Sequence, residues 1–209
     1  MIPLYFEKAG PDNTERTASL CLDRAQELDI RHIVVASNQG VTAQEFIRQA
    51  RERGLQLYRA VPGSDAAAVP QSMLNLVVVT HQVGFREPGV DEMPAEVRRS
   101  LMAEGVRVLT TTHLFSGVDR AITKEFGGLY PGQVVAHALY MFSQGVKVAV
   151  EVAVMALDAG LIPYGQEVIA VGGSGRGADS ALVMLPAHSR RFFETKILEI
   201  ICKPRDGGD

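Results

Sequence analysis

Residues 34–46, with the sequence VVASNQGVTAQEF, decide the fold. They begin with a short β-branched run that is apolar throughout, which is typical of a strand buried on both faces of a parallel sheet. A polar turn from Ser37 to Thr42 follows at once, and residues 42–53 are predicted to form an amphipathic helix. A buried strand that passes through a short turn into a helix is the building unit of an α/β protein.

The rest of the chain repeats this alternation of strands and helices. Strands are predicted at residues 33–36, 55–61, 74–80, 106–111, 168–171, 181–185 and 197–201, and helices at 13–28, 42–53, 94–103, 116–126, 132–144 and 146–159. The last three strands are separated by turns, which favours an antiparallel or mixed edge on a parallel sheet. Because no repeat or long linker interrupts the pattern, residues 1–209 are predicted to form a single domain.

The composition argues against a nucleic-acid-binding or membrane protein. The 209 residues carry 21 Lys and Arg against 24 Asp and Glu, a net charge of −3, whereas proteins that bind nucleic acid usually have a basic excess. The longest weakly charged stretch, residues 134–162, contains Lys147, Glu151 and Asp158, and is predicted to form two buried or half-buried helices. With two cysteines and no signal-peptide pattern, we expect a cytoplasmic protein with no metal cluster.

The turn after the first buried strand has the features of a phosphate or carboxylate site. Ligands of open α/β sheets bind beyond the carboxyl ends of the strands. Here the free amides of a helix start lie beside the hydroxyls of Ser37 and Thr42 and beside Gly40, with Asn38 and Val41 in the same turn. A plain helix cap with a glycine turn is the alternative, because Ser, Asn and Thr are common caps.

A glycine-rich loop follows the predicted strand at residues 168–171. It contains Gly172, Gly173, Ser174, Gly175, Arg176, Gly177, Ala178, Asp179 and Ser180. No strong helix pattern follows, so the loop is not the dinucleotide-binding fingerprint. We interpret it as a loop whose backbone lies against a ligand, with Arg176 supplying charge and Asp179 a hydrogen-bond partner. A tight hairpin with an exposed arginine is the alternative.

Two further strands end in Thr-His segments. The residues concerned are Thr80, His81, Gly84 and Phe85 in one segment, and Thr111, His113 and Phe115 in the other. Both segments are expected on the same edge of the sheet as Ser37. His81 and His113 can titrate near neutral pH, which makes them the candidate catalytic residues, and the phenylalanines could stack on a planar ring. Either segment taken alone also fits a histidine that ends a strand and a phenylalanine in the core.

The two helices of residues 132–159 carry weaker signals. Glu151 and Asp158 lie seven residues apart on one face, as an acid pair would, although a buried carboxylate capped by backbone or arginine is the usual case. His137 and Met141 are expected in the core or at a helix interface. The motifs of zinc proteases, hydrolases with a nucleophile elbow and P-loop enzymes do not occur in the sequence.

Several segments together resemble a family of small archaeal and bacterial proteins described as pyruvate kinase α/β-domain-like, which resemble the C-terminal domain of pyruvate kinase standing alone. The resemblance rests on residues 5–17, 34–43, 80–89, 113–122, 143–163, 172–187 and 200–205. It implies a three-layer α/β/α sandwich with a mostly parallel mixed sheet, whose last strands include an antiparallel one.

The resemblance also implies a ligand. In pyruvate kinase, the turn that matches Ser37, Asn38, Gly40, Val41 and Thr42 helps hold the phosphate of a sugar-bisphosphate effector. The catalytic barrel has no counterpart here, so pyruvate kinase activity is not implied. Members of the family are associated with flavin mononucleotide (FMN), which implies that the phosphate lies at this helix start and that the glycine loop and Thr-His segments face the ring and ribityl chain.

We therefore expect a protein that binds FMN or another phosphorylated small molecule. One alternative is a flavin-dependent oxidoreductase that uses His81 or His113 for proton transfer. The other is an effector-sensing module that acts through homo-oligomer contacts, for which the apolar helices of residues 132–159 offer an interface. The family is otherwise functionally uncharacterised.

Overall fold

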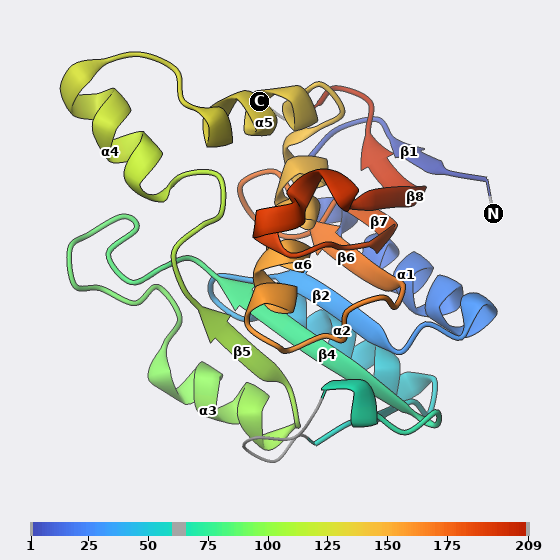
Figure 1. Ribbon diagram of the computed structural model, residues 1–209. Coiled ribbons are helices and arrows are strands. Elements are labelled where there is room, and N and C mark those ends of the chain that lie inside the picture. Colours follow the sequence, from blue (N-terminus) through green and yellow to red (C-terminus); the bar gives the residue numbers. More distant parts are fainter. Residues whose placement is uncertain (1, 60–65, 208–209) are drawn as a thin grey trace.

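A mixed β-sheet forms the middle layer of the protein (Figure 1). The computed structural model describes residues 2–59 and 66–207. Within these residues the strands are β1 (Leu4–Phe6), β2 (His32–Ala36), β3 (Gln56–Leu57), β4 (Met73–Thr80), β5 (Arg107–Thr110), β6 (Val168–Gly172), β7 (Ser180–Leu185) and β8 (Lys196–Pro204). Their order is β1-β8-β7-β6-β2-β4-β3, and β5 also pairs with β4.

Helices cover both faces of the sheet (Figure 1). They are α1 (Thr14–Leu28), α2 (Val41–Glu52), α3 (Ala95–Ala103), α4 (Gly117–Phe126), α5 (Pro131–Tyr140) and α6 (Gln144–Asp158), with short 3₁₀ helices η1 (Pro11–Asn13), η2 (Ala66–Ala68) and η3 (Ser189–Glu194). The first three helices share one hydrophobic cluster, and α6 forms the centre of another. The predicted three-layer α/β/α architecture is therefore confirmed.

The sheet is parallel except at β7. Strand β2 pairs in parallel with β4 on one side and with β6 on the other, while β7 runs antiparallel to both β6 and β8. After β2, strands β4 and β5 extend the sheet on one side of β2. The chain then passes through α4, α5 and α6 and forms β6 on the other side of β2. This reversal between β2 and β6 is a topological switch point, where open α/β sheets bind their ligands.

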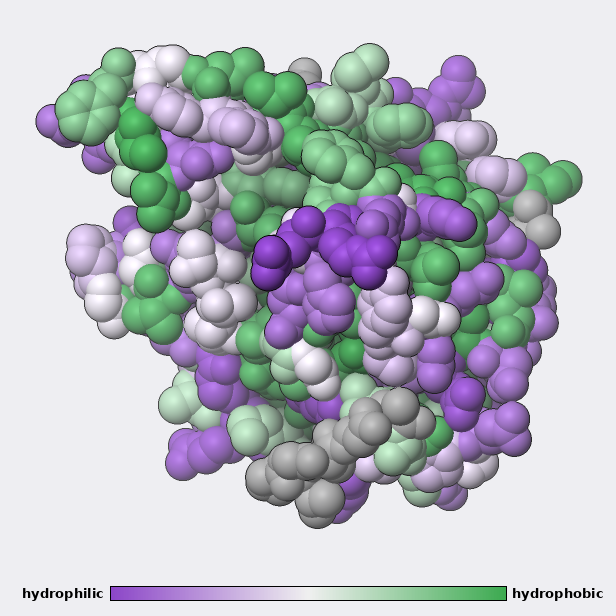
Figure 2. Space-filling view, viewed as in Figure 1, coloured by the Kyte–Doolittle hydropathy of each residue, from purple (hydrophilic) through white to green (hydrophobic). Residues whose placement is uncertain are grey.

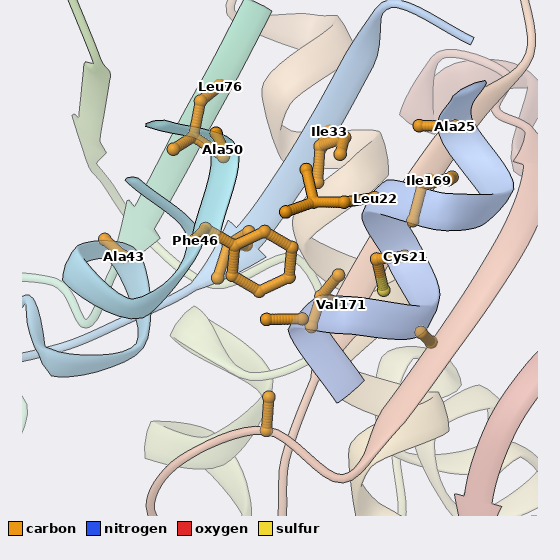
Figure 3. Close-up of a cluster of buried hydrophobic side chains, with 14 of the residues drawn as sticks. Cys21, Leu22, Ala25, Ile33, Ala43, Phe46, Ala50, Leu76, Ile169 and Val171 are labelled. Atoms are coloured by element: carbon orange, nitrogen blue, oxygen red, sulfur yellow. The ribbon is translucent and has the colours of Figure 1, made fainter. Parts of the chain in front are cut away.

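Alternation along β2 explains why its residues 33–36 are all apolar. Ile33 belongs to the cluster under α1 and α2, together with Leu22, Phe46 and Ile169 (Figure 3). Val34, the next residue, belongs to the cluster under α6. Successive side chains of a strand point to opposite faces, so the middle of a strand that is covered on both faces is mostly apolar.

Some predicted elements differ from the observed ones. The strand expected at residues 55–61 is reduced to Gln56–Leu57 among the described residues, and its last two positions lie outside them. Strand β1 was not predicted, because its three residues show no pattern of their own and, within the described residues, pair only with β8 at the sheet edge. The helix expected at residues 132–144 ends at Tyr140, and Met141, expected in the core or at a helix interface, is 85% exposed.

Burial of His32 makes the stability of this fold depend on pH. The side chain at the start of β2 is 2% exposed, and its Nδ1 lies 3.0 Å from Asn75 Nδ2. Burial, together with the positive charges of Arg31 and Arg107, lowers the pKa of His32 to about 4. In the unfolded chain the pKa is about 6.5, so between these values the unfolded state binds the extra proton.

We expect the contribution of His32 to be complete above pH 6.5 and to disappear as the pH falls to about 4. The difference between the two pKa values corresponds to about 3 kcal/mol. Urea denaturation at a series of pH values should therefore show a steeper loss of stability for wild type than for His32→Gln. His188→Gln is the control, because this histidine lies at the surface. Equal slopes for wild type and His32→Gln would contradict the assignment.

Candidate functional site

A cleft of about 1430 Å³ opens at the carboxyl ends of β2, β4, β5 and β6. Its wall includes the first turns of α1, α2 and α6, with Thr14, Thr42 and Lys147 among the lining residues. Residues of α4 and α5 line it from the side, Arg120 and His137 among them. The cleft therefore lies at the switch point of the sheet, and three helices start at its wall.

The turn before α2 leaves backbone amides available at the wall of the cleft. Gly40 has a φ of 88° and precedes the helix without a side-chain cap. The hydroxyl of Ser37 accepts a weak hydrogen bond from the amide of Ala43 at 3.4 Å. Within residues 2–59 and 66–207, the amides of Val41 and Thr42 have no protein acceptor. Two unpaired amides at a helix N-terminus can hold an anion.

Glycine at position 40 is required by the backbone and by packing. A Cβ atom there would lie 2.4 Å from Val97 Cγ1, and the left-handed φ disfavours any other residue. Gly40 does not line the cleft, whereas its neighbours Ser37, Asn38, Val41 and Thr42 do.

The two Thr-His segments lie side by side, because β4 and β5 are adjacent parallel strands. Thr80 and Thr110 share a hydrogen bond of 2.6 Å between their hydroxyls. The amide of His81 donates to Asn38 Oδ1 at 3.0 Å, and Asn38 Nδ2 lies 2.9 Å from His81 Nε2. The predicted proximity of the segments after β2 and β4 is thus confirmed by direct contacts.

Both ring nitrogens of His81 contact protein groups. Nε2 contacts Asn38, and Nδ1 lies 2.5 Å from Glu92 Oε2. The other carboxylate oxygen of Glu92, Oε1, lies 2.9 Å from Arg86 Nε. This network fixes the plane of the imidazole. Because neither nitrogen is left for a ligand, His81 is better suited to position a ring than to transfer a proton.

Three rings form what we call the aromatic shelf, which consists of His81, Phe85 and His113. The rings of His81 and Phe85 are stacked with their centroids 3.9 Å apart, and His113 lies 5.3 Å from each of them. All three line the cleft. A planar ligand could extend this stack.

The surroundings of His113 determine its charge. Burial lowers the pKa of His113, and the positive charge of Lys147 adds to this effect, while Glu151 opposes it. The imidazole of His113 is therefore neutral at pH 7. The charges of Lys147 and Glu151, which both lie on α6, act on it.

Lys147 and Glu151 form an ion pair in the wall of the cleft, which we call the α6 ion pair. Lys147 Nζ lies 2.5 Å from Glu151 Oε2, and Glu151 Oε1 accepts the amide of Phe115 at 2.9 Å. The ammonium group also lies 5.5 Å from the ring centre of Phe115 and 5.9 Å from that of Tyr140. We did not predict this pair, although the signal was present: a Lys and a Glu four residues apart in an otherwise apolar helix.

Glu151 and Asp158 do not act together as an acid pair. Asp158 lies at the other end of α6, where it contacts His188 Nδ1 at 2.9 Å and accepts the amide of Ser189, and it does not line the cleft. The expectation that a buried carboxylate would be capped by backbone is confirmed at Glu151.

Only part of the glycine-rich loop reaches the cleft. Gly173, Gly175 and Arg176 line it, whereas Gly172, Ser174 and Asp179 do not. Asp179 is fully buried, and its carboxylate accepts the amides of Gly10 at 3.0 Å and Ser174 at 3.1 Å. The interpretation of Asp179 as a ligand partner is therefore not supported, because internal donors occupy it.

Gly84 and Thr111 also lie outside the cleft. The amide of Gly84 donates to the carbonyl of Val90 at 2.9 Å and closes a turn, and Thr111 is exposed to solvent. The predicted site residues that line the cleft are Ser37, Asn38, Val41, Thr42, Thr80, His81, Phe85, His113, Gly173, Gly175 and Arg176.

Two of the positively charged side chains that line the cleft are available to a ligand. Arg48, Arg86 and Lys147 are paired with carboxylates. Among the described residues, Arg120 and Arg176 have no carboxylate within ion-pair distance. The same residues contain no cluster of three His, Cys, Asp or Glu that could hold a metal, and none of their helices has the length and hydrophobicity needed to cross a membrane.

The fold and cleft define an α/β sandwich with a ligand-sized cavity at its switch point. Residues 15–184 match the family described as pyruvate kinase, alpha/beta domain. The chain therefore belongs to this family, as the resemblance predicted.

Solved structures with similarity to this chain include two of pyruvate kinase from Cryptosporidium parvum. One of them, in complex with ADP, is 17% identical with a TM-score of 0.35, and the other is 15% identical with a TM-score of 0.36. Each match covers 81% of this chain and 22% of the enzyme, so the chain spans about a fifth of the length of these enzymes.

Proposed function

We propose that the cleft binds a phosphorylated small molecule, with FMN as the first candidate. The observation that carries the proposal is that unpaired helix amides and an aromatic shelf line one cleft. Its volume of about 1430 Å³ is sufficient for a nucleotide-sized ligand.

The donor set of the cleft fits such a ligand. The amides of Val41 and Thr42, the hydroxyl of Thr42 and the guanidinium of Arg176 would hold the phosphate. The aromatic shelf would hold the isoalloxazine ring by stacking. FMN, when bound, supplies electron- or hydride-transfer chemistry, while the protein orients the ring and fixes the protonation state of the groups around it.

The first experiment is the absorption and mass spectrum of the purified protein, followed by thermal unfolding with added FMN or riboflavin. A ligand at 100 times its dissociation constant stabilises the folded state by about 2.7 kcal/mol. FMN should raise the Tm more than riboflavin does, because only FMN carries the phosphate.

Arg176→Ala should weaken FMN binding about tenfold and leave riboflavin binding unchanged, since a charge-assisted hydrogen bond to phosphate contributes about 1.5 kcal/mol or more. Arg190→Ala is the matched control, because this exposed arginine of η3 does not line the cleft. If neither FMN nor any phosphorylated metabolite raises the Tm, the proposal fails.

A flavin-dependent oxidoreductase is the second candidate function, and His113 favours it. This imidazole is neutral, half-buried and part of the shelf, so it is suited to accept a proton near a bound ring. Reduction of bound flavin by a nicotinamide cofactor should be rapid in wild type and slow in His113→Ala. Equal rates in the two proteins would count against a role for His113.

An effector-sensing module is the third candidate, favoured by apolar side chains exposed on and around α4 and α5. Figure 2 shows hydrophobic surface over these helices; Val118 is 72% exposed, Phe126 80% and Met141 85%. Such a surface is typical of protein contacts. Sedimentation velocity with and without FMN should then reveal a ligand-dependent change of mass that Phe126→Ser abolishes.

A further inference from the structure

The α6 ion pair is unexpected on grounds of stability. Lys147 and Glu151 are only 8% and 3% exposed, on a helix whose other buried residues are apolar or glycine. Removing two charges from water costs free energy that their mutual attraction often fails to repay, and apolar residues at such positions are often neutral or stabilising. An ion pair buried in the wall of a cleft therefore indicates a role towards what the cleft binds.

The pair lies next to the aromatic shelf. The amide that Glu151 accepts belongs to Phe115, two residues beyond His113, so the carboxylate holds this segment in place. The charges of both residues act on the imidazole of His113. A ring that stacks on the shelf would therefore present one edge to Lys147 and Glu151.

The two residues offer opposite hydrogen-bonding groups at that edge. The ammonium of Lys147 has three N–H donors, and among the described residues Glu151 is its only hydrogen-bond acceptor. The carboxylate of Glu151 accepts two hydrogen bonds, while its two oxygens have capacity for about four. A donor beside an acceptor is complementary to a ring carbonyl beside a ring N–H.

We infer that the α6 ion pair is a subsite that recognises a ring edge in which a carbonyl lies beside an N–H group. The inference rests on the proposed function and narrows the ligand to phosphorylated compounds with a flavin- or uracil-type ring. An adenine ring, which has no carbonyl, leaves the ammonium of Lys147 without an acceptor, and a site with unpaired polar groups discriminates strongly.

Titration calorimetry with FMN, UMP and AMP tests the subsite. Wild type should bind FMN, UMP or both at least tenfold more tightly than AMP, and the preferred ligand distinguishes the flavin from the uracil ring. In the double variant Lys147→Met/Glu151→Met, the preference should fall at least tenfold. This variant removes both charges together, so it avoids an unpaired buried charge, and it leaves no side-chain donor or acceptor at the subsite; a circular-dichroism melt establishes that it is folded.

The matched control is Arg24→Met/Glu199→Gln, which removes an ion pair outside the cleft and should keep the preference. Equal affinity of wild type for FMN, UMP and AMP, or a preference retained by the α6 double variant, would overturn the subsite and leave the proposed function intact. If wild type binds none of the three nucleotides and no other phosphorylated metabolite, both proposals are overturned.

Discussion

Gly172→Ala is expected to destabilise the protein by about 3 kcal/mol, the upper end of the usual cost of overpacking a core. A Cβ atom at this position would lie 2.2 Å from the carbonyl oxygen of Gly145 and 2.8 Å from the amide of Ala149. Both are backbone atoms of α6, which packs on β6 at this point. Because backbone cannot rotate away as a side chain can, the helix itself would have to shift from the sheet.

Urea denaturation measures this effect directly. Gly165→Ala is the control, because no atom of the described residues lies within 4 Å of its Cβ position and its φ is 80°. The strain of that conformation alone should cost about 1 kcal/mol. If both variants lost the same stability, the close approach between α6 and β6 would not be the reason for glycine at position 172.

Asp179→Ala is expected to cost about 4 kcal/mol. The fully buried carboxylate accepts the amides of Gly10 and Ser174 on one oxygen and the hydroxyl of Ser180, at 2.9 Å, on the other. Removing the acceptor leaves two amides unpaired, at about 1 to 3 kcal/mol each. The effect is large because a single side chain joins the start of the chain to the loop after β6.

The comparison with Asp179→Asn isolates the role of the acceptor oxygens. The amide carbonyl can take the place of Oδ2 and keep both backbone amides paired, so this variant should lose less than half as much stability as Asp179→Ala. Chemical denaturation provides the free energies, and hydrogen exchange at the amides of Gly10 and Ser174 should accelerate only in Asp179→Ala. Slow exchange there in Asp179→Ala would contradict the assigned hydrogen bonds.

The sequence predicted the architecture well because each buried strand has a local signature. The run around Val34 and the polar turn to Thr42 identify a strand, a helix start and the edge of the sheet at which they meet. This edge brings the segments of Ser37, His81 and His113 together, as predicted. Strand β1 was missed because only its pairing with β8 defines it.

The site was predicted less completely. The sequence does not show whether a residue is needed to contact a ligand or to pack against another part of the protein. A glycine is needed wherever a backbone approaches closely, whether the neighbour is a ligand or another helix. Gly172 meets α6, while Gly175 lines the cleft and has no neighbour near its Cβ position in the part of the chain that the structure describes. Asp179 has the polarity of a ligand group, yet its partners are the amides of Gly10 and Ser174 and the hydroxyl of Ser180.

The pairing of β2 with both β4 and β6 joins segments that lie far apart in the sequence. Val34 pairs with Val77 on one side and with the much later residue Ala170 on the other. While β6 is unpaired, β2 has an apolar edge that is open to association with other chains. Such long-range pairing slows folding, and we expect refolding yields to fall as protein concentration rises, with the partly built sheet as the aggregating species.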